Sequence, residues 1–223
     1  MRYWILLLGT ACGTMNSARP LAEGQHAVGL TLGGPMVEFG GNYIPLPNAV
    51  LEGRSGMAPI AGNDWDINYG LNLTALAFDQ AGFHFGGTYQ VLGQNGNIPA
   101  ISVSNRLFLY SNHLSGNTID ESKGLWANDE VSLTLSWKLG RQMVYTGLSQ
   151  YFDLSNPNPT ITPFLGAEFF NTGKNNGFAL QFEVRNYATG WNPTITSAKW
   201  NTPFGSGGFG GNLGFIYRFG GGQ

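Results

Sequence analysis

The stretch WDINYGLNLTALAF, residues 65–78, alternates apolar and polar side chains with a period of two. Trp65, Ile67, Tyr69 and Leu71 begin one face, and the residues between them are polar or small. This period is that of a β-strand with one apolar and one polar face. The run exceeds the roughly five or six residues of a strand in a soluble protein. It suits a tilted strand that crosses a bilayer, which needs about 9–11 residues.

The same alternation recurs along the chain. Its clearest further examples are FHFGGTYQV (83–91), EVSLTLSWKL (130–139), ITPFLGAEF (161–169) and GFALQFEVRNY (177–187). Weaker runs cover 26–33, 48–57, 98–111 and 143–153, and a final strand covers 211–219. Bacterial outer-membrane barrels have an even number of strands. We therefore predict an all-β fold, a transmembrane antiparallel up-and-down β-barrel of about ten strands (8–12), over residues 25–219.

Composition agrees with a barrel whose apolar residues are spread along many strands. Charged residues make up 11% of the chain, well below the roughly 25% of ordinary soluble domains. The 42% hydrophobic content and mean hydropathy of −0.09 argue against a bundle of membrane helices. A net charge of −2 gives no electrostatic basis for binding nucleic acid. A single cysteine excludes an internal disulfide or a cysteine metal cluster. The histidines His26, His84 and His113 lie far apart and no nucleotide fingerprint is present, so we predict no metal site and no cofactor.

The N-terminal stretch MRYWILLLGTACG predicts a signal peptide over 1–12, with Arg2 before a short apolar core. Gly-Thr-Ala-Cys resembles a bacterial lipobox, which implies lipidation of Cys12; Gly9 departs from that pattern. The alternative is a plain signal peptide cut nearby, for instance after Ala18. We expect residues 13–24 to form a flexible lead-in and 220–223 a short tail.

The end of the chain, NLGFIYRF, resembles the C-terminal strand signal of bacterial outer-membrane β-barrel proteins. The likeness rests on Asn212, Gly214, Tyr217 and Phe219. It implies a place in the outer membrane of a Gram-negative bacterium, contact with membrane lipid and lipopolysaccharide, and recognition by the barrel-insertion machinery. Family members usually end on the aromatic residue, whereas four residues follow it here. The alternative fold is a soluble β-sandwich or a periplasmic sheet protein.

Loop lengths suggest an orientation for such a barrel. If the N-terminus lies in the periplasm, the connections on that side should be short. The expected inner connections are 93–97, 139–142 and 171–176, and the expected outer ones are 34–47, 78–82, 112–128 and 189–210. All of the outer ones except 78–82 are long, as this orientation requires.

The phase of the strands directs several charged residues into the barrel. They are Glu52, Arg54, Asp66, Arg106, Lys138, Glu168, Glu183, Arg185 and Arg218. An unpaired charge in a narrow interior is costly, so residues of mixed sign should pair. Such a set either stabilises a filled barrel or lines a narrow selective pore.

One loop carries residues of types that act in catalysis. In YSNHLSGN (110–117), His113 and Ser115 stand two apart. This arrangement is similar to that of outer-membrane lipid esterases, the lipid A deacylases and phospholipases, and implies Ser115 as nucleophile and His113 as base. The third member would be Asp129 or Glu130, neither of which matches a motif. The alternative is a polar loop start.

From the sequence we favour a non-enzymatic barrel of structural, surface-interaction or narrow-pore type. The alternatives are the lipid esterase with Ser115, His113 and Asp129, and adhesion or ligand binding through the long outer loops. The segment 189–210, with Trp191 and Trp200, is a candidate for such a surface, and its aromatic residues can equally pack on the rim of the barrel.

Overall fold

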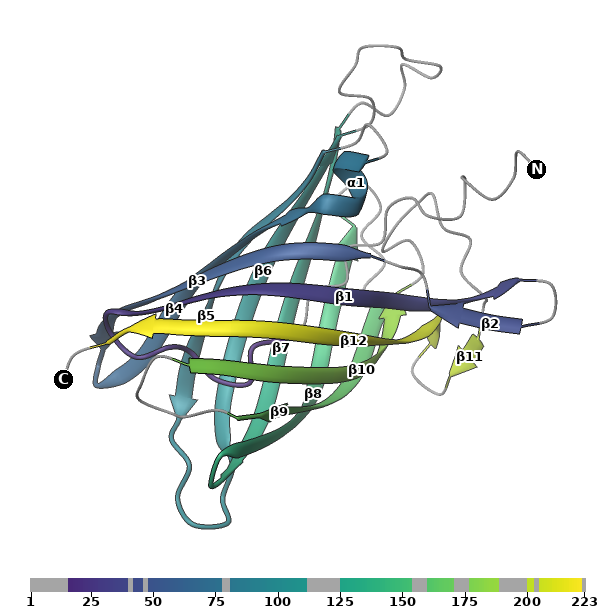
Figure 1. The fold of residues 1–223 in the computed structure, drawn as a ribbon. Helices are drawn as coiled ribbons and strands as arrows, with labels where there is room; N and C mark the ends of the chain where they lie inside the picture. The colour runs from purple at the N-terminus through teal and green to yellow at the C-terminus, as the bar shows by residue number, and fades with distance from the viewer. Residues whose placement is uncertain are drawn as a thin grey trace.

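The computed structural model describes residues 16–39, 42–45, 48–77, 81–111, 125–153, 160–170, 177–188, 200–202 and 205–221. Within these residues a single sheet of twelve strands is present, and ten of them form a closed antiparallel barrel (Figure 1). The ten are β1 (Gln25–Phe39), β3 (Ala49–Ile60), β4 (Asn63–Asn72), β5 (Ala81–Leu92), β6 (Ala100–Ser111), β7 (Leu125–Leu139), β8 (Gln142–Asp153), β9 (Thr160–Phe169), β10 (Gly177–Ala188) and β12 (Gly205–Gly220).

The order of the strands around the barrel follows their order in the chain. The ring closes between β1 and β12, which pair antiparallel from Gln25 opposite Gly220 to Pro35 opposite Gly210. Closure leaves the barrel wall without a free sheet edge, which is the requirement for strands that cross a membrane. The prediction of an antiparallel up-and-down barrel of about ten strands is therefore confirmed.

Two short strands lengthen the wall at the end opposite the C-terminus (Figure 1). β2 (Asn42–Pro45) pairs with the last residues of β1, and β11 (Trp200–Thr202) pairs with the first residues of β12. The outer connections expected at 34–47 and 189–210 are thus strands in part. Hairpin pairing satisfies backbone N–H and C=O groups that a loop would leave to water.

The predicted strand 65–78 is wrong in its last third. β4 ends at Asn72, and a short helix, α1 (Leu73–Ala77), follows it. The Oδ1 atom of Asn72 accepts a hydrogen bond from the backbone N–H of Ala75 at 2.9 Å, the contact of a helix N-cap. Leu and Ala are strong helix formers, so a cap at Asn72 suffices to end the strand. In the described part of the chain, no helix is long and apolar enough to cross a membrane.

The two faces of the wall differ as the alternation predicts. Large apolar side chains point outward and are exposed, among them Tyr69, Phe83, Phe85, Leu133, Leu148, Leu165, Phe178 and Phe215. Polar side chains point inward and are buried, among them Asp66, Asn68, Thr88, Ser102, Ser132, Thr134, Ser149 and Glu183. Phe178 is 74% exposed and Glu183 is 1% exposed. An apolar outer face around a polar interior is the distribution of a transmembrane barrel.

The end of the barrel near the C-terminus carries tight turns and tryptophans. Ala61–Gly62 joins β3 to β4, and Gly140–Arg141 joins β7 to β8. Near these turns the indole N–H of Trp65 donates to the carbonyl of Ala58 at 2.7 Å, and that of Trp137 donates to Asn97 at 3.0 Å. Amphipathic rings of this kind gather at membrane–water interfaces. The connection expected at 171–176 lies outside the described residues.

Candidate functional site in the barrel lumen

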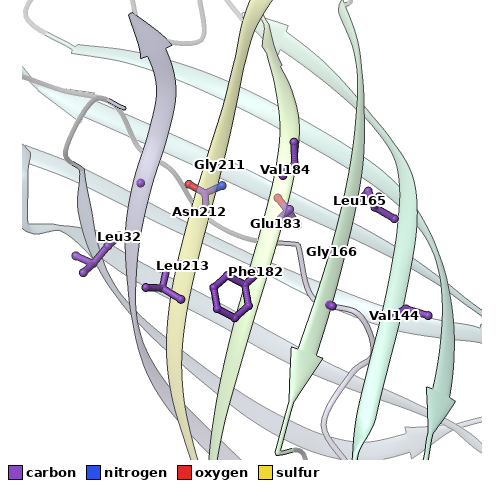
Figure 2. Close-up of a pocket in the computed structure, with 12 residues that line it drawn as sticks. Leu32, Val144, Leu165, Gly166, Phe182, Glu183, Val184, Gly211, Asn212 and Leu213 are labelled. Carbon is purple, nitrogen blue, oxygen red and sulfur yellow. The ribbon is translucent and has the colours of Figure 1, made fainter. Parts of the chain in front are cut away.

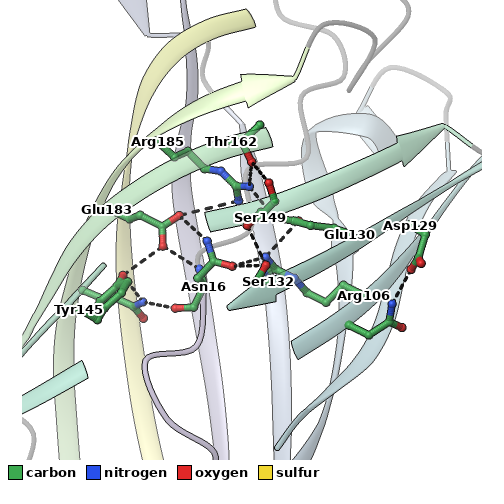
Figure 3. A network of polar contacts seen from close by, with 12 residues as sticks. Asn16, Arg106, Asp129, Glu130, Ser132, Tyr145, Ser149, Thr162, Glu183 and Arg185 are labelled. Carbon is green, nitrogen blue, oxygen red and sulfur yellow. Dashed lines mark hydrogen bonds and ion pairs between the residues drawn. The ribbon is translucent and has the colours of Figure 1, made fainter. Parts of the chain in front are cut away.

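The middle of the lumen holds a chain of four alternating charges (Figure 3). Arg106 on β6 contacts Glu130 on β7, with Nη2 and Oε2 3.1 Å apart. Arg185 on β10 contacts the other oxygen of Glu130 at 2.5 Å, and its Nη1 lies 3.9 Å from Oε1 of Glu183. All four side chains are buried. Each charge faces a charge of opposite sign, which offsets the cost of removing them from water.

Two further ion pairs lie in the barrel. Arg54 on β3 pairs with Asp66 on β4. Arg218 on β12 pairs with Glu168 on β9: its Nη2 donates a hydrogen bond to Oε2 at 2.8 Å, and its Nη1 lies 2.7 Å from Oε1. Paired contacts of this kind match the planar guanidinium to the carboxylate.

The remaining two charged residues expected inside are placed differently. Glu52 on β3 faces the lumen, and its Oε1 has no hydrogen-bond partner among the described residues. Lys138 lies exposed at the end of β7, where its backbone N–H donates to Oε1 of Gln94 at 2.7 Å. Glu130, which bridges two arginines, was not among the nine residues expected inside. Its place in the polar phase of EVSLTLSWKL was the signal that could have found it.

Residues 16–21, part of the stretch predicted as a flexible lead-in, lie inside the barrel, and residues 22–24 are exposed at its rim. Asn16, 1% exposed, is the hub of the central network in Figure 3. Its backbone N–H donates to Oε2 of Glu183 at 2.8 Å, and its carbonyl accepts from Nε2 of Gln181 at 2.8 Å. Its side-chain Oδ1 accepts from Arg106 at 2.9 Å and from Ser132 at 3.1 Å. One residue of the segment thus joins strands β6, β7 and β10.

The next residues of the segment bind side chains of β3, β4 and β7. The carbonyl of Arg19 accepts a hydrogen bond from Arg54 at 2.6 Å, and the backbone N–H of Leu21 donates to Asp66 at 2.8 Å. The guanidinium of Arg19 donates to Oγ of Ser136 at 2.9 Å and to its carbonyl at 3.2 Å. Both members of the Arg54–Asp66 ion pair therefore also bind the backbone of the segment.

Apolar contacts and the rim fix the two sides of the segment. Ala18 packs in a buried cluster with Met143, Tyr145 and Phe164. At the rim near the C-terminus, the N–H of Gly24 donates to the carbonyl of Gly56 at 3.3 Å, and the N–H of Gly221 donates to the carbonyl of Gly24 at 2.8 Å. The segment therefore enters the lumen beside the end of β12.

Close approach of the segment to β3 explains a glycine in that strand. A Cβ atom at Gly56 would lie 1.9 Å from the carbonyl oxygen of Ala22. No side chain fits in that space without moving the backbone of the segment. Glycine at position 56 therefore permits the close contact between β3 and the segment.

Of the residues predicted to act as an esterase, the structure describes the two carboxylates. His113 and Ser115 lie outside the described residues, as does Cys12. Asp129 is on the outer face of β7, where its Oδ1 accepts a hydrogen bond from Asn105 at 2.8 Å. Glu130 is on the lumen side, held by two arginines. The two carboxylates considered for the triad are therefore on opposite faces of the wall. In the described part of the chain, no three His, Cys, Asp or Glu side chains could hold a metal ion.

The residues of the C-terminal signal lie on the strand that closes the barrel. Asn212 is buried, whereas Tyr217 and Phe219 are exposed on the outer face. The ring of Tyr217 lies 4.8 Å from that of Phe178 on β10, and the ring of Phe219 lies 5.5 Å from that of His26 on β1. The aromatic residues of β12 thus bridge both neighbouring strands.

The outer face carries an apolar groove of about 720 Å³ across β1, β12, β10, β9 and β8 (Figure 2). Leu32, Val144, Leu165, Phe182 and Leu213 surround it. Gly166 and Gly211 are also among its lining residues. An apolar groove at this level of a barrel wall suits a hydrocarbon chain.

Comparison with known proteins gives little beyond the structure itself. No protein-family model and no curated protein matches the chain. Among solved structures, Ail, the attachment invasion locus protein of Yersinia pestis, matches in two crystal structures, one in complex with the heparin analogue sucrose octasulfate. Identities are 11% and 9%, TM-scores are 0.30 and 0.28, and each match covers 88% of this chain and 99% of that chain. The fold assignment therefore rests on the strand pairing of this chain.

Proposed function

We propose that this protein is a closed outer-membrane barrel with a structural or surface-interaction role and without catalytic activity. One observation carries the proposal: Asn16 lies in the middle of the lumen and bonds to Glu183, Gln181, Arg106 and Ser132. A barrel of eight to ten strands has an interior that side chains largely fill, and here a segment of the chain fills it further. The favoured role therefore lies on the outside of the molecule.

The surroundings of the barrel follow from its outer face. We place it in the outer membrane of a Gram-negative bacterium, because its apolar outer face, closed wall and even strand number suit that bilayer. Lipid chains contact the outer face and its groove, and lipopolysaccharide contacts the end where β2 and β11 lie. The barrel-insertion machinery reads β12 through Asn212, Gly214, Tyr217 and Phe219.

The interaction surface is the end of the barrel where β1–β2 and β11–β12 extend the wall. These hairpins give the segment 189–210 a rigid base on the closing strands of the barrel. Loops on a rigid scaffold are the usual place for binding. Shortening this segment should abolish binding of the protein to a bacterial or host surface while heat-modifiable migration shows that the barrel is intact.

Single-channel recording separates this role from the narrow-pore alternative. The purified mature protein, inserted in planar bilayers, should give no stable conductance. Stable openings in folded protein, with an ion selectivity that changes in Arg185→Gln, would favour the pore instead. Arg185 is chosen for this substitution because it lies in the lumen and contacts both Glu130 and Glu183.

A further inference from the structure

The lumen recognises residues 16–21 largely through their main chain. Two carboxylates accept backbone N–H groups: Glu183 from Asn16, and Asp66 from Leu21. Two donors bind backbone carbonyls: Gln181 binds that of Asn16, and Arg54 binds that of Arg19. Side chains that bind both kinds of backbone group form a site for a peptide main chain.

Three side chains of the segment add specificity to these main-chain contacts. The amide of Asn16 accepts from Arg106 and Ser132, and Ala18 fits a closed apolar cluster. The guanidinium of Arg19 reaches Ser136. A side chain too bulky for the Ala18 cluster, or a residue without an amide at position 16, loses these contacts.

The barrel wall does not need the segment. The sheet closes through β1 and β12, and no described residue of 16–24 belongs to a strand. The site also keeps partners of its own: Glu183 accepts from the hydroxyl of Tyr145 at 3.2 Å, and that hydroxyl accepts from Gln181 at 2.6 Å. Release of the segment therefore breaks no strand pairing and leaves Glu183 hydrogen-bonded.

We propose that the lumen is a binding site for a short peptide, which residues 16–21 occupy in cis and which accepts the same sequence in trans. The ligand is a peptide with Asn, Ala and Arg at the spacing Asn-x-Ala-Arg. This inference goes beyond the proposed function, because it concerns the lumen and not the outer surface. A barrel that binds nothing at its outer end would still satisfy it.

The test uses the chain without its leader, residues 13–223, folded in detergent. This chain lacks Cys12, so Ala18→Cys introduces its single thiol. We expect a maleimide to label this thiol at least ten-fold more slowly than the matched variant Glu23→Cys, because Ala18 is buried and Glu23 is exposed. Equal rates in chains with heat-modifiable migration would overturn the proposal, since the cis segment would not be seated.

Competition in trans tests the site itself. A tethered segment acts at an effective concentration in the millimolar range, so its own affinity is first lowered by adding Asn16→Ala to Ala18→Cys. The acetylated peptide of residues 16–24 should then speed labelling several-fold and reach saturation. The same peptide with Ala in place of Asn16 should do so at least ten-fold less effectively. No acceleration by the first peptide, or equal acceleration by both, would overturn the proposal.

Discussion

The backbone N–H of Asn16 donates a hydrogen bond to Oε2 of Glu183, 167 residues further along the chain, across the lumen of the barrel. The two residues lie at the centre of a buried network that also contains Arg106, Glu130 and Arg185. A segment that resembles a lead-in thus completes the interior of the fold.

Glu130→Gln should be among the most destabilising single substitutions in the lumen. Glu130 is the carboxylate between Arg106 and Arg185, and breaking a buried ion pair costs about 3–5 kcal/mol. The matched control is its neighbour on the opposite face, Asp129→Asn, which keeps an oxygen for the hydrogen bond from Asn105. Urea unfolding followed by tryptophan fluorescence measures both. Equal losses in the two variants would show that the lumen network does not stabilise the fold.

Gly56→Val should expel the segment while leaving the wall in place. Its Cβ would meet the carbonyl oxygen of Ala22 at 1.9 Å, so the segment has to move. The control is Gly93→Ala, whose Cβ would have its nearest neighbour at 3.5 Å, the end of the flexible Gln90 side chain. Maleimide labelling of Ala18→Cys should accelerate in the first variant and not in the second. Unchanged protection in a folded Gly56→Val barrel would place the segment elsewhere.

Lipidation of Cys12 and seating of Asn16 should exclude each other. Four residue steps separate the two positions, and they span at most about 14 Å. Asn16 lies in the middle of the lumen, so the chain would have to leave the lumen and pass around the rim before an acylated Cys12 reached the lipid outside the wall. Mass spectrometry of the mature protein should therefore find an N-terminus upstream of Asn16 and no acyl chains. A diacylated Cys12 in a protein with a protected Ala18→Cys thiol would contradict this.

Ser115→Ala should leave lipid chemistry unchanged. The proposed role is not catalytic. Of the two carboxylates considered for the triad, Asp129 binds Asn105 on the outer face and Glu130 binds two arginines in the lumen. Free fatty acid released from phospholipid and lipopolysaccharide should be at background for the folded wild type and for the variant. Release that disappears only in Ser115→Ala would establish the esterase.

Sequence periodicity predicts the wall well because each strand repeats one local rule. Apolar residues alternate with polar ones wherever lipid lies on one side and the lumen on the other, so strands such as β7 and β10 were found with their inward faces. The rule fails at Leu73–Ala77, where a period of two continues by chance through a helix that Asn72 caps.

The filling of the lumen is beyond local rules. Residues 16–24 have no periodicity, and their partners, such as Glu183 and Asp66, are fixed only when the barrel closes. Glu130 could have been assigned from its phase, but its two arginine partners come from β6 and β10, which the sequence does not place beside one another. Strand alternation therefore predicts which face a residue occupies and not which residue it meets.

An NMR spectrum of the isotope-labelled protein in micelles shows whether the chain fills its own lumen. The methyl group of Ala18 packs in a cluster with the rings of Tyr145 and Phe164. If Ala18 is seated in the lumen, this methyl group should give nuclear Overhauser cross-peaks to the ring protons of that cluster, and the rings should displace its chemical shift. A methyl signal at the position of an unstructured peptide, without cross-peaks to either ring in a folded barrel, would contradict the account.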